Sequence, residues 1–122
     1  MNEYNPIGTF SLNNRIPQVK KNVILIKGKV QNTLDNFLDG NKNNKIIFAH
    51  LDMDTYLPTK FTLKKIKSFL TKGSILLFDQ FYGYPNWKDH EYRAFIEEFK
   101  NTEYKFIAFS ESEVAIEFLD NK

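Results

Sequence analysis

The sequence predicts an α/β fold with a mostly parallel sheet and an antiparallel pair of strands at its C-terminal end. Two observations support this prediction. Short, continuous apolar runs alternate with segments of helical periodicity, and the last two apolar segments are joined by a short polar turn. Continuous apolar strands are typical of a parallel sheet covered on both faces, and so short a turn joins only antiparallel strands. The length of 122 residues suits a single α/β domain over residues 1–122.

The N-terminal third of the chain begins without periodicity. Residues 1–22 carry scattered proline and glycine and are expected to form an irregular arm. The apolar run that follows, ending near Gly28, predicts a buried strand at 23–29. Residues 33–38 then place apolar side chains at the i, i+3, i+4 spacing of a helix.

The rest of the chain continues the alternation. Pro58 suits the first turn of a helix, and Gly73 follows the expected end of that helix at Lys72. The remaining elements are also expected from apolar runs and periodicity: strands at 46–52, 74–79, 104–109 and 113–119, and a helix at 92–99.

Composition excludes several classes of protein. The chain has no cysteine, which rules out a disulfide scaffold and a thiolate zinc site. It has 17 basic and 15 acidic residues, and Arg15 and Arg93 are the only arginines, which argues against nucleic-acid binding. No apolar run approaches the ~20 residues of a membrane span, and the N-terminus does not resemble a signal peptide. We therefore expect a cytoplasmic protein without nucleic-acid or membrane partners.

Polar residues follow two neighbouring strands of the expected sheet. These residues are His50, Asp52, Asp54, Asp79 and Gln80. In open α/β sheets, ligands bind beyond the carboxyl ends of the strands. In extended backbone Asp52 and Asp54 would point the same way. Three converging carboxylates require a cation or a proton, and oxygen ligands suit magnesium or calcium. A carboxylate outside the metal shell could act as a general base.

The residues alone leave other interpretations open. Asp52 and Asp54 could simply begin a turn and cap the next helix. His50 could be a hydrogen-bonded residue near a strand end or a ligand. The aromatic loop at 81–87 could pack against a helix or form a substrate wall. Glu91, at the start of the third helix, is expected to face solvent, as is its neighbour His90.

Two groups of residues resemble a known family. Residues 50–56 read His-Leu-Asp-Met-Asp-Thr-Tyr and are followed by a helix, and residues 72–79 then lead through Lys-Gly-Ser into an apolar strand that ends in Asp. Together with 25–28 and 33–34, this pattern resembles the macrocin O-methyltransferase family of class I S-adenosylmethionine-dependent methyltransferases. The resemblance covers roughly residues 16–100.

The resemblance implies a Rossmann-like, partial class I methyltransferase fold that methylates a hydroxyl of a small molecule or sugar. It implies S-adenosylmethionine as cofactor and Mg²⁺ held by Asp52 and Asp79. Asp54 matches the general base, and Gln80 stands where the family has a second aspartate ligand. The further candidates are Gly28 and His50 for the cofactor, and Tyr56, Tyr82 and Trp87 for the substrate. No glycine-rich turn of the kind these enzymes use precedes Val23, so we expect a truncated form that carries only the C-terminal part.

Two alternative functions stay open. Residues 52–55 also resemble the nucleophile motif of haloacid-dehalogenase-like phosphatases, with Asp52 as nucleophile and Asp54 as acid/base. The chain could instead be a non-catalytic methyltransferase remnant, or a subunit that forms homo-oligomers through an exposed sheet edge.

Overall fold

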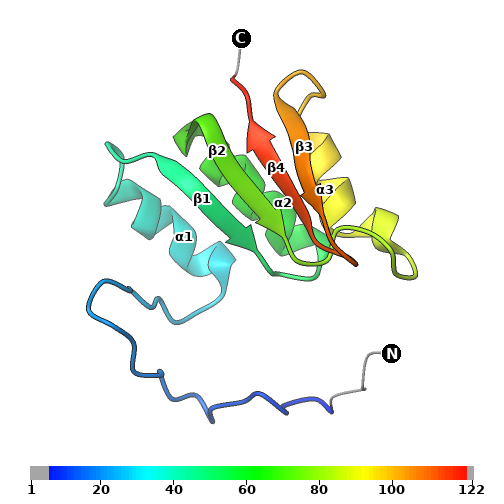
Figure 1. Ribbon diagram of the computed structural model, residues 1–122. Coiled ribbons are helices and arrows are strands. Elements are labelled where there is room, and N and C mark those ends of the chain that lie inside the picture. The colour runs from blue at the N-terminus through cyan, green and yellow to red at the C-terminus, as the bar shows by residue number, and fades with distance from the viewer. Residues whose placement is uncertain (1–5, 121–122) are drawn as a thin grey trace.

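The computed structural model describes residues 6–120 and contains one four-stranded sheet with three α-helices (Figure 1). The helices and strands follow in the order α1 (Val30–Asp39), β1 (Ile46–Leu51), α2 (Tyr56–Ile66), β2 (Leu70–Phe78), α3 (Glu91–Glu98), β3 (Tyr104–Phe109) and β4 (Val114–Phe118). Short 3₁₀ turns lie at Lys67–Phe69 and Trp87–Asp89. None of the helices within residues 6–120 is long and apolar enough to cross a membrane.

The sheet is mixed, with the strand order β1-β2-β4-β3. Strands β1 and β2 are parallel, whereas β4 pairs antiparallel with both β2 and β3. The antiparallel C-terminal pair is confirmed, but the expectation of a mostly parallel sheet is wrong. The chain returns from β3 through a short turn, so β4 inserts beside β2 in the opposite direction. The parallel pair carries the carboxyl ends of β1 and β2 to the same edge.

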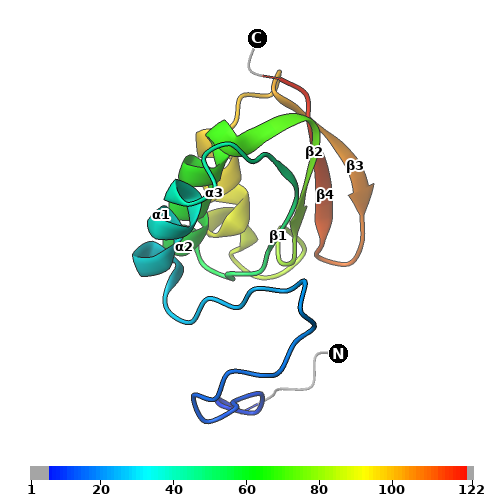
Figure 2. The ribbon, with the colours of Figure 1, turned by 90° about the vertical axis from the view of Figure 1, so that its left-hand side faces the viewer.

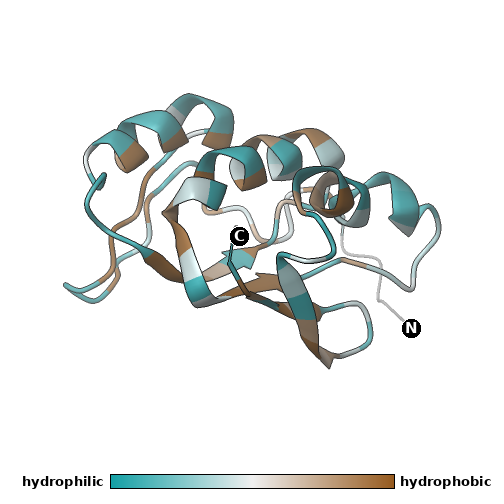
Figure 3. Ribbon diagram, turned by 90° about the horizontal axis from the view of Figure 1, so that it is seen from above, coloured by the Kyte–Doolittle hydropathy of each residue, from teal (hydrophilic) through white to brown (hydrophobic). Residues whose placement is uncertain are grey.

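All three helices cover the same face of the sheet (Figures 2 and 3). Alternate residues of β2 and β4 point into this layer and are buried, including Leu76, Phe78, Val114 and Ile116. On the other face Phe48 of β1 is 56% exposed. The expectation that helices cover both faces is therefore wrong. Apolar residues on the open face of a short sheet make its strands look continuously hydrophobic in sequence.

The expected strand at 23–29 is absent. Residues 6–27 form an arm outside the layers of the fold, as Figures 1 and 2 show. The side chains of Val23 to Ile26 are 42–79% exposed. An apolar run forms a strand only where a neighbouring strand accepts its hydrogen bonds, and no strand of the described region pairs with this one. The irregular arm expected at 1–22 is confirmed for residues 6–22, and residues 1–5 lie outside the described region.

The second helix ends earlier than its sequence pattern predicts. It stops at Ile66, and β2 already begins at Leu70, so Lys72 and Gly73 belong to the strand. An irregularity in the β1–β2 pairing accommodates them, with Gly73 at φ +89°. The Ser74 hydroxyl donates to the Ile46 carbonyl at 2.6 Å and accepts the Thr71 N–H at 2.8 Å. These bonds fix β2 against β1 upstream of the site.

An aromatic core holds α3 against the sheet. The ring of Phe95 lies within 6 Å of those of Phe78, Phe81 and Tyr104, in tilted or edge-on arrangements. Phe78 ends β2, so this packing fixes the end of the strand from which the next acidic residue projects.

Candidate functional site

Three aspartates converge at the carboxyl ends of β1 and β2. Asp52 and Asp54 follow β1, and Asp79 follows β2. Each offers a carboxylate oxygen, and these oxygens all lie within 4.8 Å of one another. The Asp79 N–H donates to the Leu51 carbonyl at 3.1 Å, so the pairing of the two strands continues up to the acidic residues. The parallel register therefore brings these side chains together.

The convergence of Asp52 and Asp54 has a different cause from the one expected. The backbone is not extended here, because Asp54 has φ +60°, in the left-handed region. Aspartate tolerates this conformation better than most residues. The Thr55 N–H donates to the Met53 carbonyl at 2.6 Å and closes a tight turn into α2. The turn, rather than the two-residue repeat of a strand, brings Asp54 back towards Asp52.

Crowding of like charges is visible in the pKa of Asp79. Burial raises this pKa above its ordinary value, and repulsion from Asp52 and a hydrogen bond with it raise it further. The charge of His50 acts in the opposite direction, with Nε2 at 3.8 Å from the Asp79 carboxylate. A cation placed among these carboxylates would relieve the repulsion.

Glu91 is buried, which corrects the expectation that it faces solvent. Its exposed fraction is 0%, and its Oε2 accepts the Gln80 N–H at 2.8 Å. Burial is the main cause that raises the pKa of Glu91 to about 7, and repulsion from Asp54, Asp79 and Asp52 raises it further. The hydrogen bond from the Gln80 N–H lowers this pKa. The sequence carries a signal for this residue, since Glu91 lies at the i, i+3, i+4 spacing with the buried Ala94 and Phe95.

Gln80 is held by its backbone, and its side chain is exposed. In addition to the bond with Glu91, its carbonyl accepts the Tyr84 hydroxyl at 3.1 Å. Gln80 also lines a pocket of about 390 Å³ together with Tyr84 and Ser112. Its side-chain oxygen is therefore on the same edge of the sheet as the aspartates and free to reorient.

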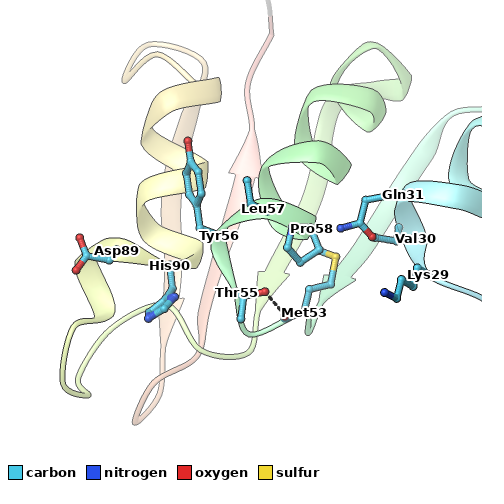
Figure 4. Close-up of a pocket in the computed structure, with 10 residues that line it drawn as sticks. All are labelled: Lys29, Val30, Gln31, Met53, Thr55, Tyr56, Leu57, Pro58, Asp89 and His90. Atoms are coloured by element: carbon cyan, nitrogen blue, oxygen red, sulfur yellow. Dashed lines mark hydrogen bonds between the residues drawn. The ribbon is translucent and has the colours of Figure 1, made fainter.

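The three aromatic residues expected around the substrate each make packing contacts. The Tyr56 hydroxyl donates to Glu97 of α3 at 2.5 Å, and its ring lies along α3 (Figure 4). The Tyr82 hydroxyl donates to the Ser110 carbonyl. Trp87 packs edge-on against Tyr92, with ring centroids 4.8 Å apart. In the same loop Phe81 is buried in the core, so part of the aromatic loop is helix packing.

A larger pocket of about 690 Å³ lies beside the acidic edge. It is formed by the start of α1, the β1–α2 turn and the segment before α3, and Met53, Pro58 and His90 contribute to it (Figure 4). Both apolar and polar side chains line this pocket, which is a common composition for small-molecule sites.

Gly28 precedes α1 and has a local explanation. Its φ is +138°, and a Cβ atom there would lie 2.8 Å from the Thr33 methyl group. The chain needs a glycine here to enter α1, so the residue type has a structural reason that does not depend on a cofactor. Within residues 6–120 no strand precedes Gly28, so the described region holds no strand, glycine turn and helix of the kind that binds S-adenosylmethionine. The residues present therefore do not make a complete site for this cofactor.

The acidic edge does fit a divalent cation. Ligands of octahedral Mg²⁺ at about 2.0–2.1 Å lie about 3–4 Å from one another. One carboxylate oxygen of each of the three aspartates lies within 4.8 Å of the other two, which is close to this spacing. All the donors are hard oxygen atoms, which magnesium prefers.

Comparison with known proteins gives a consistent picture of the fold. No protein-family model and no curated protein matches the chain. Two solved structures of the methyltransferase CalS11 resemble it at 29% identity over 84% of this chain. One is the apo form, described as a TDP-rhamnose 3'-O-methyltransferase of calicheamicin biosynthesis, with a TM-score of 0.71 and 43% of that chain covered. The other is described as a calicheamicin methyltransferase, with a TM-score of 0.72 and 40% covered.

This chain thus spans about two fifths of the length of the two structures. Its mixed α/β fold is similar to part of a methyltransferase fold. Both structures are of CalS11, and the likeness to them does not single out the macrocin O-methyltransferase family.

Proposed function

We propose that this chain forms the metal- and acceptor-binding part of an O-methyltransferase that acts on a hydroxyl of a sugar or another small molecule. The observation that carries the proposal is the convergence of Asp52, Asp54 and Asp79 within 4.8 Å at the carboxyl edge of the sheet. The similarity to a TDP-rhamnose O-methyltransferase supports the reaction class. It also supports a sugar as the acceptor.

In this proposal each polar residue has a distinct role. Asp52 and Asp79 follow neighbouring strands and would hold Mg²⁺, and the Gln80 side-chain oxygen would be a further neutral ligand. A bound Mg²⁺ would supply Lewis-acid chemistry by lowering the pKa of the acceptor hydroxyl. Asp54 accepts the proton of that hydroxyl as general base. His50 lies within 4 Å of Asp79 and balances part of its charge.

The methyl donor implied by the likeness is S-adenosylmethionine. Because the residues at 6–120 do not complete a site for it, the proposal assigns this chain only acceptor binding and hydroxyl activation. Gly28 and His50 are the proposed contacts of this chain with the cofactor. Tyr82 and Trp87 are the proposed walls of the acceptor site, and Tyr56 is the weakest of the three aromatic candidates because Glu97 and α3 already engage it.

Isothermal titration of the full chain with Mg²⁺ tests the proposal. Asp52→Ala should abolish Mg²⁺ binding, since it removes a ligand from one of the two strands. Asp54→Asn should still bind Mg²⁺, because both proposed ligands remain, but should lose the ability to deprotonate an acceptor. A parent chain that binds no Mg²⁺ at millimolar concentration would overturn the metal role.

Titration with S-adenosylmethionine and S-adenosylhomocysteine is the second arm of the test. Binding of either would support methyl transfer by this chain itself. Binding of Mg²⁺ without either cofactor would favour the second candidate, a non-catalytic unit. The open face and free edge of the sheet favour this candidate, because such surfaces are usually covered by a partner.

A further inference from the structure

Glu91 presents a buried polar atom that the fold does not satisfy. The residue is the first of α3 and has no exposed surface. Its Oε2 accepts the Gln80 N–H, whereas its Oε1 is buried and accepts no hydrogen bond from the described residues. Buried carboxylate oxygens are almost always hydrogen-bonded, because leaving one unpaired costs free energy. The unpaired Oε1 of Glu91 is therefore an exception to this rule.

The surroundings of Glu91 make the unpaired oxygen more costly. Its Oε2 accepts the N–H of Gln80, the residue next to Asp79, so the buried carboxylate lies beside the acidic edge. Repulsion from Asp54, Asp79 and Asp52 contributes to its raised pKa. None of the ion pairs formed by residues 6–120 includes Glu91. Four acidic groups therefore lie close together at the acidic edge of the sheet. The buried one, Glu91, forms no ion pair with any of the described residues.

A purely structural role would not need a carboxylate. Anchoring the Gln80 N–H takes one acceptor oxygen, which a glutamine amide also provides. A glutamine of the same shape would avoid the cost of a buried charge. A purely structural anchor therefore explains neither the negative charge of Glu91 nor its second carboxylate oxygen.

We propose that Glu91 is a positioning residue of the cation site at the acidic edge, where Asp52 and Asp79 are the proposed ligands and Asp54 lies beside them. Its Oε2 fixes the backbone next to Asp79, and its buried charge adds to the attraction of the three aspartates for a divalent cation. The inference rests on the proposed metal role of the acidic edge and extends the site to α3. Outer partners of metal ligands typically change metal affinity 10–100-fold when they are removed.

The test compares Mg²⁺ titrations of the full chain with those of Glu91→Gln and Glu91→Asp at about pH 8. Glu91→Gln keeps the shape and an acceptor for Gln80 but removes the charge, so Mg²⁺ affinity should fall about tenfold. Glu91→Asp keeps the charge but is one methylene too short to hold the Gln80 N–H as closely, so its affinity should fall less than that of Glu91→Gln. Glu98→Gln, which makes the same charge change further along α3, is the control and should change affinity less than twofold.

Denaturant unfolding in metal-free buffer separates positioning from folding. Glu91→Gln should be at least as stable as the parent, because it relieves a buried charge. Equal Mg²⁺ affinity of the parent and Glu91→Gln would overturn the inference and leave the proposed metal role intact. An equal loss in Glu91→Asp and Glu91→Gln would also overturn it, since the charge would then not be the cause. A parent and a Glu98→Gln control that both bind no Mg²⁺ would refute the proposed metal role and this inference with it.

Discussion

Asp52 and Asp79 follow neighbouring parallel strands, and each offers a carboxylate oxygen within 4.8 Å of the other. After burial, Asp52 contributes most to the raised pKa of Asp79, by repulsion and by a hydrogen bond. A proton or a cation between the two carboxylates would relieve this repulsion.

Removing the charge of Asp52 should change the titration of its partner. In Asp52→Asn the pKa of Asp79 should fall, because repulsion is lost, but should stay above its ordinary value because burial persists. Carbon-detected NMR of the Asp79 carboxyl group measures this pKa. Asp35→Asn is the matched control, because Asp35 lies on α1 and is not among the charges that raise the pKa of Asp79. A pKa that rises or stays constant in Asp52→Asn would contradict the coupling.

Glu91 should make the stability of the fold depend on pH. Its pKa is raised from 4.5 to about 7, so the folded chain binds this proton more tightly than the unfolded chain does. The stabilisation is complete below about pH 4.5 and is lost as the pH rises through 7. Relative to Glu91→Gln, the parent should lose on the order of 2–3 kcal/mol of unfolding free energy between about pH 5 and 8. Urea titrations at several pH values measure this, and parallel curves for the two chains would contradict it.

The packing of α3 on the sheet should depend on Phe95. This residue is fully buried among aromatic rings of β2, β3 and the loop between β2 and α3. Phe95→Ala should cost about 3–5 kcal/mol through lost burial and a cavity. Its neighbour Ile96 is 45% exposed, so Ile96→Ala should cost less than about 1 kcal/mol. Urea unfolding measures both, and similar costs for the two variants would contradict the orientation of the helix.

The free edge of the sheet should mediate self-association. Strand β1 pairs only with β2 among the strands of residues 6–120, and Ile47 and Phe48 on it are 74% and 56% exposed. Unpaired, apolar edges favour association with another chain. We expect a homodimer or larger assembly at high micromolar concentration, and Ile47→Lys should shift it towards the monomer. Light scattering measures the mass, with Leu57→Lys, which alters an equally exposed residue of α2, as control. A parent chain that is a clean monomer would contradict the prediction.

Local sequence patterns predict most of the elements and the members of the acidic edge. The strand that ends at Leu51 and the one that ends at Phe78 are visible as apolar runs with acids directly after them. Strand direction follows from the connecting helix, so the meeting of Asp52 and Asp79 at one edge could be predicted. These features depend on residues that are close in sequence.

Features that depend on distant partners could not be predicted in the same way. The run from Val23 to Ile26 has strand-like composition, but it lacks a neighbour and stays in the arm. The open face of the sheet results from where the three helices pack, which periodicity does not specify. Glu91 looks solvent-exposed by residue type, yet it shares the buried face of α3 with Ala94 and Phe95.

The proposed metal role requires that the acidic edge binds a divalent cation between the carboxyl ends of β1 and β2. Mn²⁺, which accepts the same oxygen ligands as Mg²⁺, can be located in crystals of the full chain by its anomalous scattering. We expect one Mn²⁺ peak in contact with the carboxylates of Asp52 and Asp79, and no peak there in crystals of Asp52→Ala grown in the same way. A soaked crystal of the parent chain with no Mn²⁺ at this edge, or with Mn²⁺ bound only elsewhere, would contradict it.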